Sequence, residues 1–255
     1  MNSLIFMLLT LVLRIGTPAP DVSESPAIMQ DEMNNPVNVL MKDLTRYYVV
    51  IFWKGPNWSA GSQNILEGRA KESKQLKDLV KSGKLVGIVR ISGDADCKVL
   101  GFFKTDSKDE AWAIADSVLA VKEKVLTPEV YHVWGTRGMG AELQKQLKEG
   151  KKPEKRQALY VSLLKKGNNW KADAPEDSTA AWASRHAGAV LKWKESGSLK
   201  FYAAVDDAGP LRVMGIFSAK SPDEAKKRVN AAPSVKGGWF TASTYSCSVL
   251  EGILP

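Results

Sequence analysis

An internal repeat constrains this chain more than any other feature of its sequence. The dipeptide Lys54-Gly55 recurs as Lys166-Gly167 at an offset of 112 residues, and Ser82-Gly83 recurs as Ser196-Gly197 at an offset of 114. Two inserted residues between these points explain the change, and the second offset then holds. Chance similarity would not keep one register over roughly ninety residues, so we infer a tandem duplication. Pairs that keep the offset of 114 include Gly101 with Gly215, Ser107 with Ser221, Thr127 with Thr241 and Tyr131 with Tyr245.

Each copy shows the same order of expected elements. A β-rich run leads through a Gly-x-Asn-Trp turn into a helix that ends at Ser-Gly, where glycine supplies the left-handed conformation. Two strands follow, then a helix whose Ser and Glu, three residues apart, form a capping box, and then a last strand. The expected strands are residues 48–53, 85–91, 99–104 and 129–134 in the first copy, and 160–164, 199–205, 212–218 and 240–249 in the second.

The order βαββαβ is that of a ferredoxin-like unit, an antiparallel sheet with its helices on one face. The other face is apolar and needs a cover, and a second copy of the same sheet is the obvious one. We therefore predict an α+β protein with repeats at residues 46–135 and 157–255, joined by a basic linker with a short helix at 136–156. The fusion would replace a homodimer, so we expect a monomer, with higher assembly left open.

The N-terminus has the pattern of an export segment. Residues 4–13 (LIFMLLTLVL) form an apolar run that is too short to span a bilayer, and the small residues Gly16, Thr17 and Ala19 follow. We predict a signal peptide at residues 1–19, a secreted or periplasmic protein, and no membrane span after processing. Because no Lys or Arg precedes the run and Pro20 follows Ala19, an uncleaved anchor or a different start codon is the alternative. Residues 20–45, rich in Pro and Asn, are expected to form a disordered lead-in.

The chain is basic, with a net charge of +8 and a pI near 9.3. Its densest basic stretch, residues 145–156 (KQLKEGKKPEKR), is typical of a solvated linker, and no nucleic-acid recognition module accompanies it. We therefore expect no nucleic-acid partner. The two histidines and two lone cysteines lack the spacing of metal ligands, and no P-loop, dinucleotide fingerprint or Gly-x-Ser-x-Gly elbow is present. We expect no metal and no cofactor.

The two cysteines, Cys97 and Cys247, lie one in each copy. In an exported protein they could form a bridge between the halves, but Cys247, on an expected strand, is as easily a buried thiol. The sequence leaves both alternatives open.

Taken together, the Gly-x-Asn-Trp turn, the helix ending in Ser-Gly-x-Leu, the Gly-x-Phe strand and the Ser-x-Asp-Glu-Ala helix start resemble the YCII-related (YciI-like) domain family. The resemblance covers about residues 46–135 and 157–250. It implies that two ferredoxin-like βαββαβ units pack sheet to sheet as an intramolecular dimeric α+β barrel. It also implies a small-molecule site that does acid/base chemistry.

The resemblance implies particular site residues as well. The family's helix histidine, eleven residues before the helix-ending glycine, corresponds to His186, and its acidic turn corresponds to Asp206 and Asp207. A carboxylate beside the imidazole would set its pKa for proton transfer, and Arg185 is the immediate neighbour of His186. A histidine of the family's last strand corresponds to His132.

The copies depart from this pattern in complementary ways. The helix position of the first copy holds Glu72, and the strand position of the second copy holds Ser246. Either each half dropped one of two equivalent sites, leaving a composite site with His186 and His132, or the site has drifted and both histidines are structural. Trp58 and Trp170, which recur in the repeat, either pack in the core or stack on a ligand.

Two functions follow from different classes of protein. The first is a non-catalytic module that binds a small molecule in a cavity between or beside the two sheets, with Arg185, Trp170, Trp58, His132 and Glu72 as candidate contacts. The second is an enzyme of the lyase or isomerase type in which His186, with Asp206 and Asp207, performs acid/base catalysis.

Overall fold

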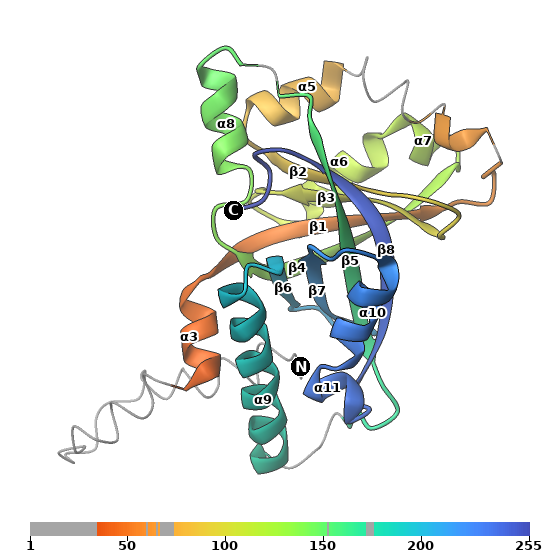
Figure 1. Cartoon of the computed structure of the whole chain (residues 1–255). Helices are drawn as coiled ribbons and strands as arrows, with labels where there is room; N and C mark the ends of the chain where they lie inside the picture. The colour runs from red at the N-terminus through yellow and green to blue at the C-terminus, as the bar shows by residue number, and fades with distance from the viewer. Residues whose placement is uncertain (1–34, 60, 65, 67–73, 152, 172–175) are drawn as a thin grey trace, which may run out of the picture. The chain divides into compact units, whose positions relative to one another are not determined.

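The computed structural model describes residues 35–59, 61–64, 66, 74–151, 153–171 and 176–255 (Figure 1). The expected signal peptide and Glu72 lie outside the described residues. Eight strands form a closed antiparallel barrel in the order β1-β3-β2-β8-β5-β7-β6-β4, which confirms the predicted α+β barrel class. The strands are β1 (Leu44–Lys54), β2 (Leu85–Ile91), β3 (Cys97–Phe103), β4 (Leu126–Thr136), β5 (Arg156–Lys166), β6 (Leu199–Val205), β7 (Leu211–Phe217) and β8 (Phe240–Leu250).

The chain divides into two compact units. The first-repeat unit comprises residues 46–160 and 245–255, and the second-repeat unit comprises the described residues of 35–45 and 161–244. The first-repeat unit contains α5 (Lys74–Lys81), α6 (Lys108–Ser117), α7 (Leu119–Lys122) and α8 (Ala141–Lys148). The second-repeat unit contains α3 (Pro36–Lys42), α9 (Glu176–Glu195), α10 (Pro222–Asn230) and α11 (Pro233–Lys236).

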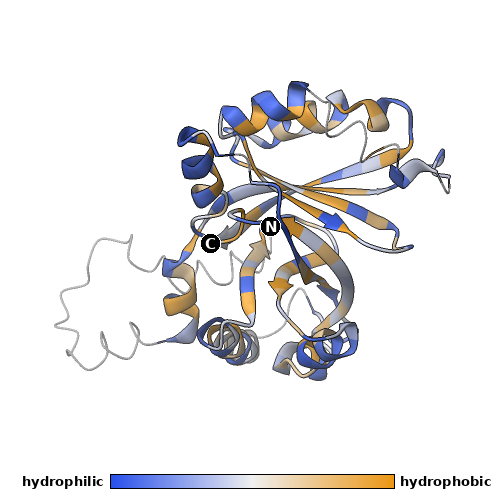
Figure 2. Cartoon of the chain, turned by 45° about the horizontal axis from the view of Figure 1, so that its top comes forward, coloured by the Kyte–Doolittle hydropathy of each residue, from blue (hydrophilic) through white to orange (hydrophobic). Residues whose placement is uncertain are grey.

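The duplication is visible in the strand registers. Leu85 lies opposite Phe103 in the β2–β3 hairpin, and Leu199 lies opposite Phe217 in the β6–β7 hairpin. Both hairpins have a register shift immediately after this leucine. The four residues are related by the offset of 114 found in the sequence, so the repeat is conserved down to an irregularity of the ladder. Buried apolar side chains dominate these strands. Figure 2 colours the chain by hydropathy and shows hydrophobic residues along the strands.

The recurring Gly-x-Asn-Trp turn fastens the first strand of each copy to the loop before its last strand. The amide of Gly55 donates to the Val125 carbonyl at 2.8 Å, and the amide of Gly167 donates to the Trp239 carbonyl at 2.8 Å. A Cβ at either glycine would lie 2.3 Å from a backbone oxygen, that of Lys124 or of Gly238. Glycine recurs at this turn because no larger residue fits there.

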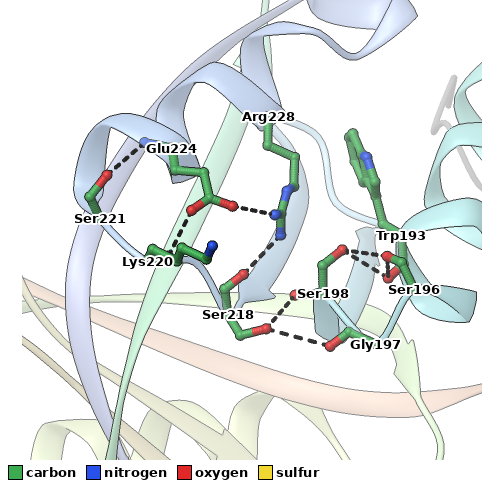
Figure 3. A network of polar contacts seen from close by, with 9 residues as sticks. All are labelled: Trp193, Ser196, Gly197, Ser198, Ser218, Lys220, Ser221, Glu224 and Arg228. Carbon is green, nitrogen blue, oxygen red and sulfur yellow. Dashed lines mark hydrogen bonds and ion pairs between the residues drawn. The ribbon is translucent and has the colours of Figure 1, made fainter.

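Capping boxes begin the second helix of each copy, as predicted. The Ser107 side chain accepts from the Glu110 amide at 3.1 Å, and the Ser221 side chain accepts from the Glu224 amide at 3.2 Å. In the second-repeat unit this cap belongs to a larger polar network. Arg228 donates to the Glu224 carboxylate and to the Ser218 carbonyl, each at 2.8 Å (Figure 3).

The predicted disordered lead-in is wrong over residues 36–45, because α3 occupies residues 36–42 and packs on α9. Asn35 caps this helix by accepting from the Val37 amide at 3.0 Å, and a proline occupies its first turn. Its apolar face, which includes Val37 and Leu40, is buried. Asp43, just after the helix, forms an ion pair with Lys194 of α9. The Asn and Pro that suggested disorder are therefore helix-start signals.

The segment expected as a basic linker contains α8, and its start is held by the C-terminal turn. The Gly140 amide donates to the Ile253 carbonyl at 2.7 Å, and the Leu143 amide donates to the Gly252 carbonyl at 2.9 Å. Leu143 and Ile253 are both buried. Because these backbone bonds and side chains fix α8, the segment is part of the first-repeat core and not only a solvated connection.

Candidate functional site

His186, the principal catalytic candidate, lies in the core of the second-repeat unit. Its side chain is only 4% exposed, and its Nδ1 atom lies 2.8 Å from the Oγ atom of Ser234 on α11. Its ring also contacts Tyr202 and meets Phe240 edge to face at 5.7 Å between centroids. Burial lowers the pKa of His186 to about 4, because the charged imidazolium loses its hydration. At neutral pH the ring is an uncharged core side chain.

The space beside His186 is too small for a substrate. A void of about 10 Å³ is lined mostly by apolar residues of α3, α9, β1 and β6, with Leu40 among them. This volume suits one water molecule at most. His186 Nε2 has no hydrogen-bond partner among the described residues. Helix α3, which was not predicted, therefore covers the imidazole ring of His186, the predicted catalyst.

The structure does not bring the predicted acidic partners to this histidine. Asp206 and Asp207 lie in the turn between β6 and β7, where the Asp207 carbonyl accepts from Arg212. Within the described structure, the one hydrogen bond of the His186 side chain is with Ser234. Arg185 is exposed and donates to the Ala181 carbonyl of its own helix at 3.2 Å. The predicted His–Asp pair is therefore not formed.

The recurring tryptophans each pack beneath a buried cation. Lys98 Nζ lies 4.7 Å from the ring centroid of Trp58, and the guanidinium carbon of Arg212 lies 5.4 Å from that of Trp170. Lys98 and Arg212 are 2% and 1% exposed and are related by the offset of 114. Burial lowers the pKa of both side chains. These pairs close the hairpin turn of each copy, since Lys98 donates to the Gly93 carbonyl and Arg212 to the Gly209 carbonyl.

His132, the second candidate histidine, lies on β4. Its ring packs against Tyr48 at 5.4 Å and Trp134 at 6.1 Å between centroids. Cys97 and Cys247 are both buried free thiols, and burial raises the pKa of Cys247 to about 12. In the part of the chain that the structure describes, no cluster of three or more His, Cys, Asp or Glu residues could hold a metal ion.

A larger cavity than the void beside His186 lies in the first-repeat unit, beside its sheet. A cavity of about 450 Å³ opens between the sheet and helices α5, α6 and α7. Its walls are mostly apolar, and none of the predicted site residues that the structure describes lines it. The lining residues are Phe52, Gln63, Leu66, Gln75, Leu76, Leu85, Ile88, Arg90, Val99, Gly101, Phe103, Ile114, Ser117, Val118, Leu119, Ala120 and Leu126.

The residues that line this cavity differ in side-chain volume from their counterparts in the second copy. Ile88 and Leu126 line it, and the second copy has Tyr202 and Phe240 at the corresponding positions, 114 residues later. Tyr202 and Phe240 are 4% and 1% exposed, and Phe240 stands at the centre of a cluster with Trp170, Trp182 and His186. In the second copy, aromatic rings thus fill the space that the smaller aliphatic side chains leave open in the first copy.

A second difference concerns the helix that covers the cavity. Ile114 of α6 lines it, whereas the corresponding residue of α10 is Arg228. Arg228 ties α10 to Ser218 at the end of β7 (Figure 3). The apolar side chain of Ile114 makes no such polar link and adds to the apolar wall of the cavity. This sequence difference was a usable signal, but it required the two repeats to be compared residue by residue.

Comparisons with known proteins identify the fold of this chain but not its function. No protein-family model matches the sequence, and a search of curated proteins finds no match. Two mutants of chlorite dismutase from Candidatus Nitrospira defluvii align with TM-scores of 0.50 at 13% and 15% identity, covering 82% of this chain and 93% of theirs. A putative chlorite dismutase aligns with a TM-score of 0.49 at 11% identity, covering 82% of this chain and 94% of that chain. At these identities the likeness shows a shared α+β barrel fold.

No helix among the described residues is both long and apolar enough to cross a membrane.

Proposed function

We propose that this protein is a non-catalytic binding module, which holds a small and mainly apolar molecule in the first-repeat cavity. The observation that carries the proposal is the volume of about 450 Å³ on one copy of a duplicated fold whose other copy is filled. Pockets for small ligands span about 300–1,000 Å³ and are lined mostly by apolar side chains. An empty apolar cavity of this size destabilises a core, so its presence in one copy alone favours a role in binding.

The alternative of acid/base catalysis has less support from the geometry. A general base must reach the substrate proton within hydrogen-bond distance and titrate near the working pH. His186 is covered by α3 and has a pKa of about 4. It also lacks the carboxylate partner that would orient it.

We further propose that the chain is a tandem relative of the YCII-related domains and is exported. The kinship rests on the motifs of both repeats, with the family's helix histidine now part of the second-repeat core. Export rests on the apolar run at residues 4–13. N-terminal sequencing of protein from its native host tests it: a mature chain starting near Pro20 supports export, and an intact Met1 on cytoplasmic protein contradicts it.

Binding can be tested with a variant that copies the second repeat into the first. In Ile88→Tyr/Leu126→Phe, two aromatic rings replace the aliphatic side chains at positions where the second copy already accommodates them. Titration calorimetry with octanol, a neutral apolar probe, should show saturable binding to the wild type and none to the variant. The variant should melt at the same or a higher temperature, because the rings fill the cavity.

The control is Leu147→Ala, a partly exposed residue of α8 outside the cavity, which should bind octanol as the wild type does. Equal octanol binding by Ile88→Tyr/Leu126→Phe and by the wild type would mean that octanol binds outside the cavity. No binding to the wild type would reject the proposed function.

A further inference from the structure

The first-repeat cavity contains one cationic group in an otherwise uncharged wall. Arg90 of β2 is partly buried and is the one charged residue among the described residues that line the cavity. Its guanidinium makes no hydrogen bond or ion pair with any described residue. By contrast, Gln75 and Ser117, two other polar lining residues, are hydrogen-bonded to each other. A guanidinium beside apolar walls is costly unless an anion pairs with it.

A second arginine, Arg156 of β5, binds the residue that lies opposite Arg90. Arg90 and Ser248 are register partners of β2 and β8, so their side chains project from the same face of the sheet. Arg156 donates to the Ser248 side chain at 3.1 Å and to its carbonyl at 2.9 Å. The Arg156 guanidinium is therefore bound to Ser248, whereas the Arg90 guanidinium has no such bond within the part of the chain that the structure describes.

The second copy shows that Arg90 is not needed by the fold. The corresponding residue on β6 is Ala204, which lies in the same register opposite Val213 as Arg90 does opposite Val99. The arginine thus occurs in the copy with the cavity and is absent from the copy that is filled.

We propose that the ligand of the first-repeat cavity is an amphipathic monocarboxylate, with its apolar body against the aliphatic walls and its carboxylate on Arg90. This inference rests on the proposed binding function and specifies its ligand class. A guanidinium fork binds a carboxylate through two parallel hydrogen bonds, and one available fork matches one carboxylate. No acidic side chain among the described lining residues competes for this position.

The test compares octanoate with octanol, which have the same total number of carbon atoms but differ in charge. The wild type should bind octanoate about 10- to 100-fold more tightly, as expected for a hydrogen bond between charged groups. In Arg90→Gln this preference should disappear, while the affinity for octanol should stay within about twofold. The control Arg46→Gln removes the same charge from an exposed position and should keep the preference.

Each result has a distinct meaning. Equal affinities of the wild type for octanoate and octanol would overturn the carboxylate inference but leave the apolar binding site intact. An octanoate preference that survives in Arg90→Gln would also overturn it, because another group would then hold the anion. Binding of neither probe would reject the proposed function itself. Melting temperatures of both variants, measured without ligand, separate loss of binding from loss of folding.

Discussion

At the scale of single residues, the surroundings of His186 determine its role more than its chemistry does. A histidine at this helix position could transfer protons if it faced a pocket, but here it contacts Ser234, Tyr202 and Phe240 in a closed core. The lowered pKa then makes folding stability depend on pH. Between pH 4 and 6.5 the unfolded chain binds a proton at this side chain that the folded chain does not bind.

The first prediction concerns the pH dependence of stability. Because the folded pKa lies below the unfolded one, the contribution of His186 is complete above about pH 6.5 and is lost as the pH falls towards 4. The loss should reach at most about 3 kcal/mol. In His186→Gln the glutamine side chain has an amide that can bond to Ser234 but cannot titrate. The unfolding free energy of this variant should therefore depend less on pH in this window. Urea unfolding at several pH values checks this, and parallel curves for the two proteins would contradict it.

A second prediction concerns the turn before the last strand of each copy. Lys124 has a positive φ of 56°, the one such non-glycine residue in the described chain, and its counterpart Gly238 has a φ of 69°. Left-handed backbone costs a non-glycine residue about 1–2 kcal/mol. Lys124→Gly should therefore stabilise the protein by up to about 1 kcal/mol, after the added flexibility of the unfolded chain is deducted.

The matched change in the other copy should act in the opposite direction. Gly238→Ala adds a Cβ at positive φ that would lie 2.8 Å from the Asn169 side chain. It should destabilise the protein by more than about 1 kcal/mol. Chemical denaturation of both variants measures the pair, and changes of the same sign would refute the strain argument.

At the scale of elements, α3 is a structural part of the second-repeat unit. Leu40 is 6% exposed and lines the void beside His186, whereas Val39 on the same helix is 40% exposed. Leu40→Ala should cost about 2–4 kcal/mol of unfolding free energy, because it removes a buried side chain and enlarges the void. Val39→Ala should change it by less than about 0.5 kcal/mol. Thermal and urea unfolding give both values, and similar values for the two variants would mean that α3 is not packed as described.

The elements also show how far sequence reasoning reaches. Strands β2 and β6 match their predicted bounds residue for residue, because the repeat provides two aligned examples of each pattern. Strands β1 and β5 are longer than predicted, and the residues added at their starts include the buried Leu44, Tyr47 and Leu159. Helix α3 was missed because seven residues with Asn and Pro at the start resemble a linker, although both are start signals.

The candidate site could be predicted less well than the fold. The spacing of residues in the sequence does not show that His186 is buried. It also does not show that His186 bonds to Ser234 and not to Asp206 or Asp207. Both facts depend on which elements pack together. The cavity depends on side-chain volume at aligned positions, and that information was present in the pairs Ile88 with Tyr202 and Leu126 with Phe240. Without a fold, nothing in the sequence indicates that these residues share one space.

At the scale of the whole molecule, the two copies have diverged in how the space between sheet and helices is used. Both retain the hairpin register, the capped second helix and the cation over the turn tryptophan. The second copy fills its space with aromatic rings, and the first keeps a cavity of about 450 Å³ with one arginine. Duplication permits such a division, because one copy supplies stability while the other tolerates the cost of a cavity.

The central claim is that a ligand enters the first-repeat cavity and not the core around His186. Nuclear magnetic resonance of the methyl-labelled protein during an octanoate titration tests it most directly, because the methyl groups of both places are observed in one experiment. The account predicts saturable shifts at Ile88, Ile114 and Leu126, with Val37, Leu40 and Leu44 unchanged. Shifts at Val37, Leu40 and Leu44 with none at Ile88, Ile114 and Leu126 would contradict it.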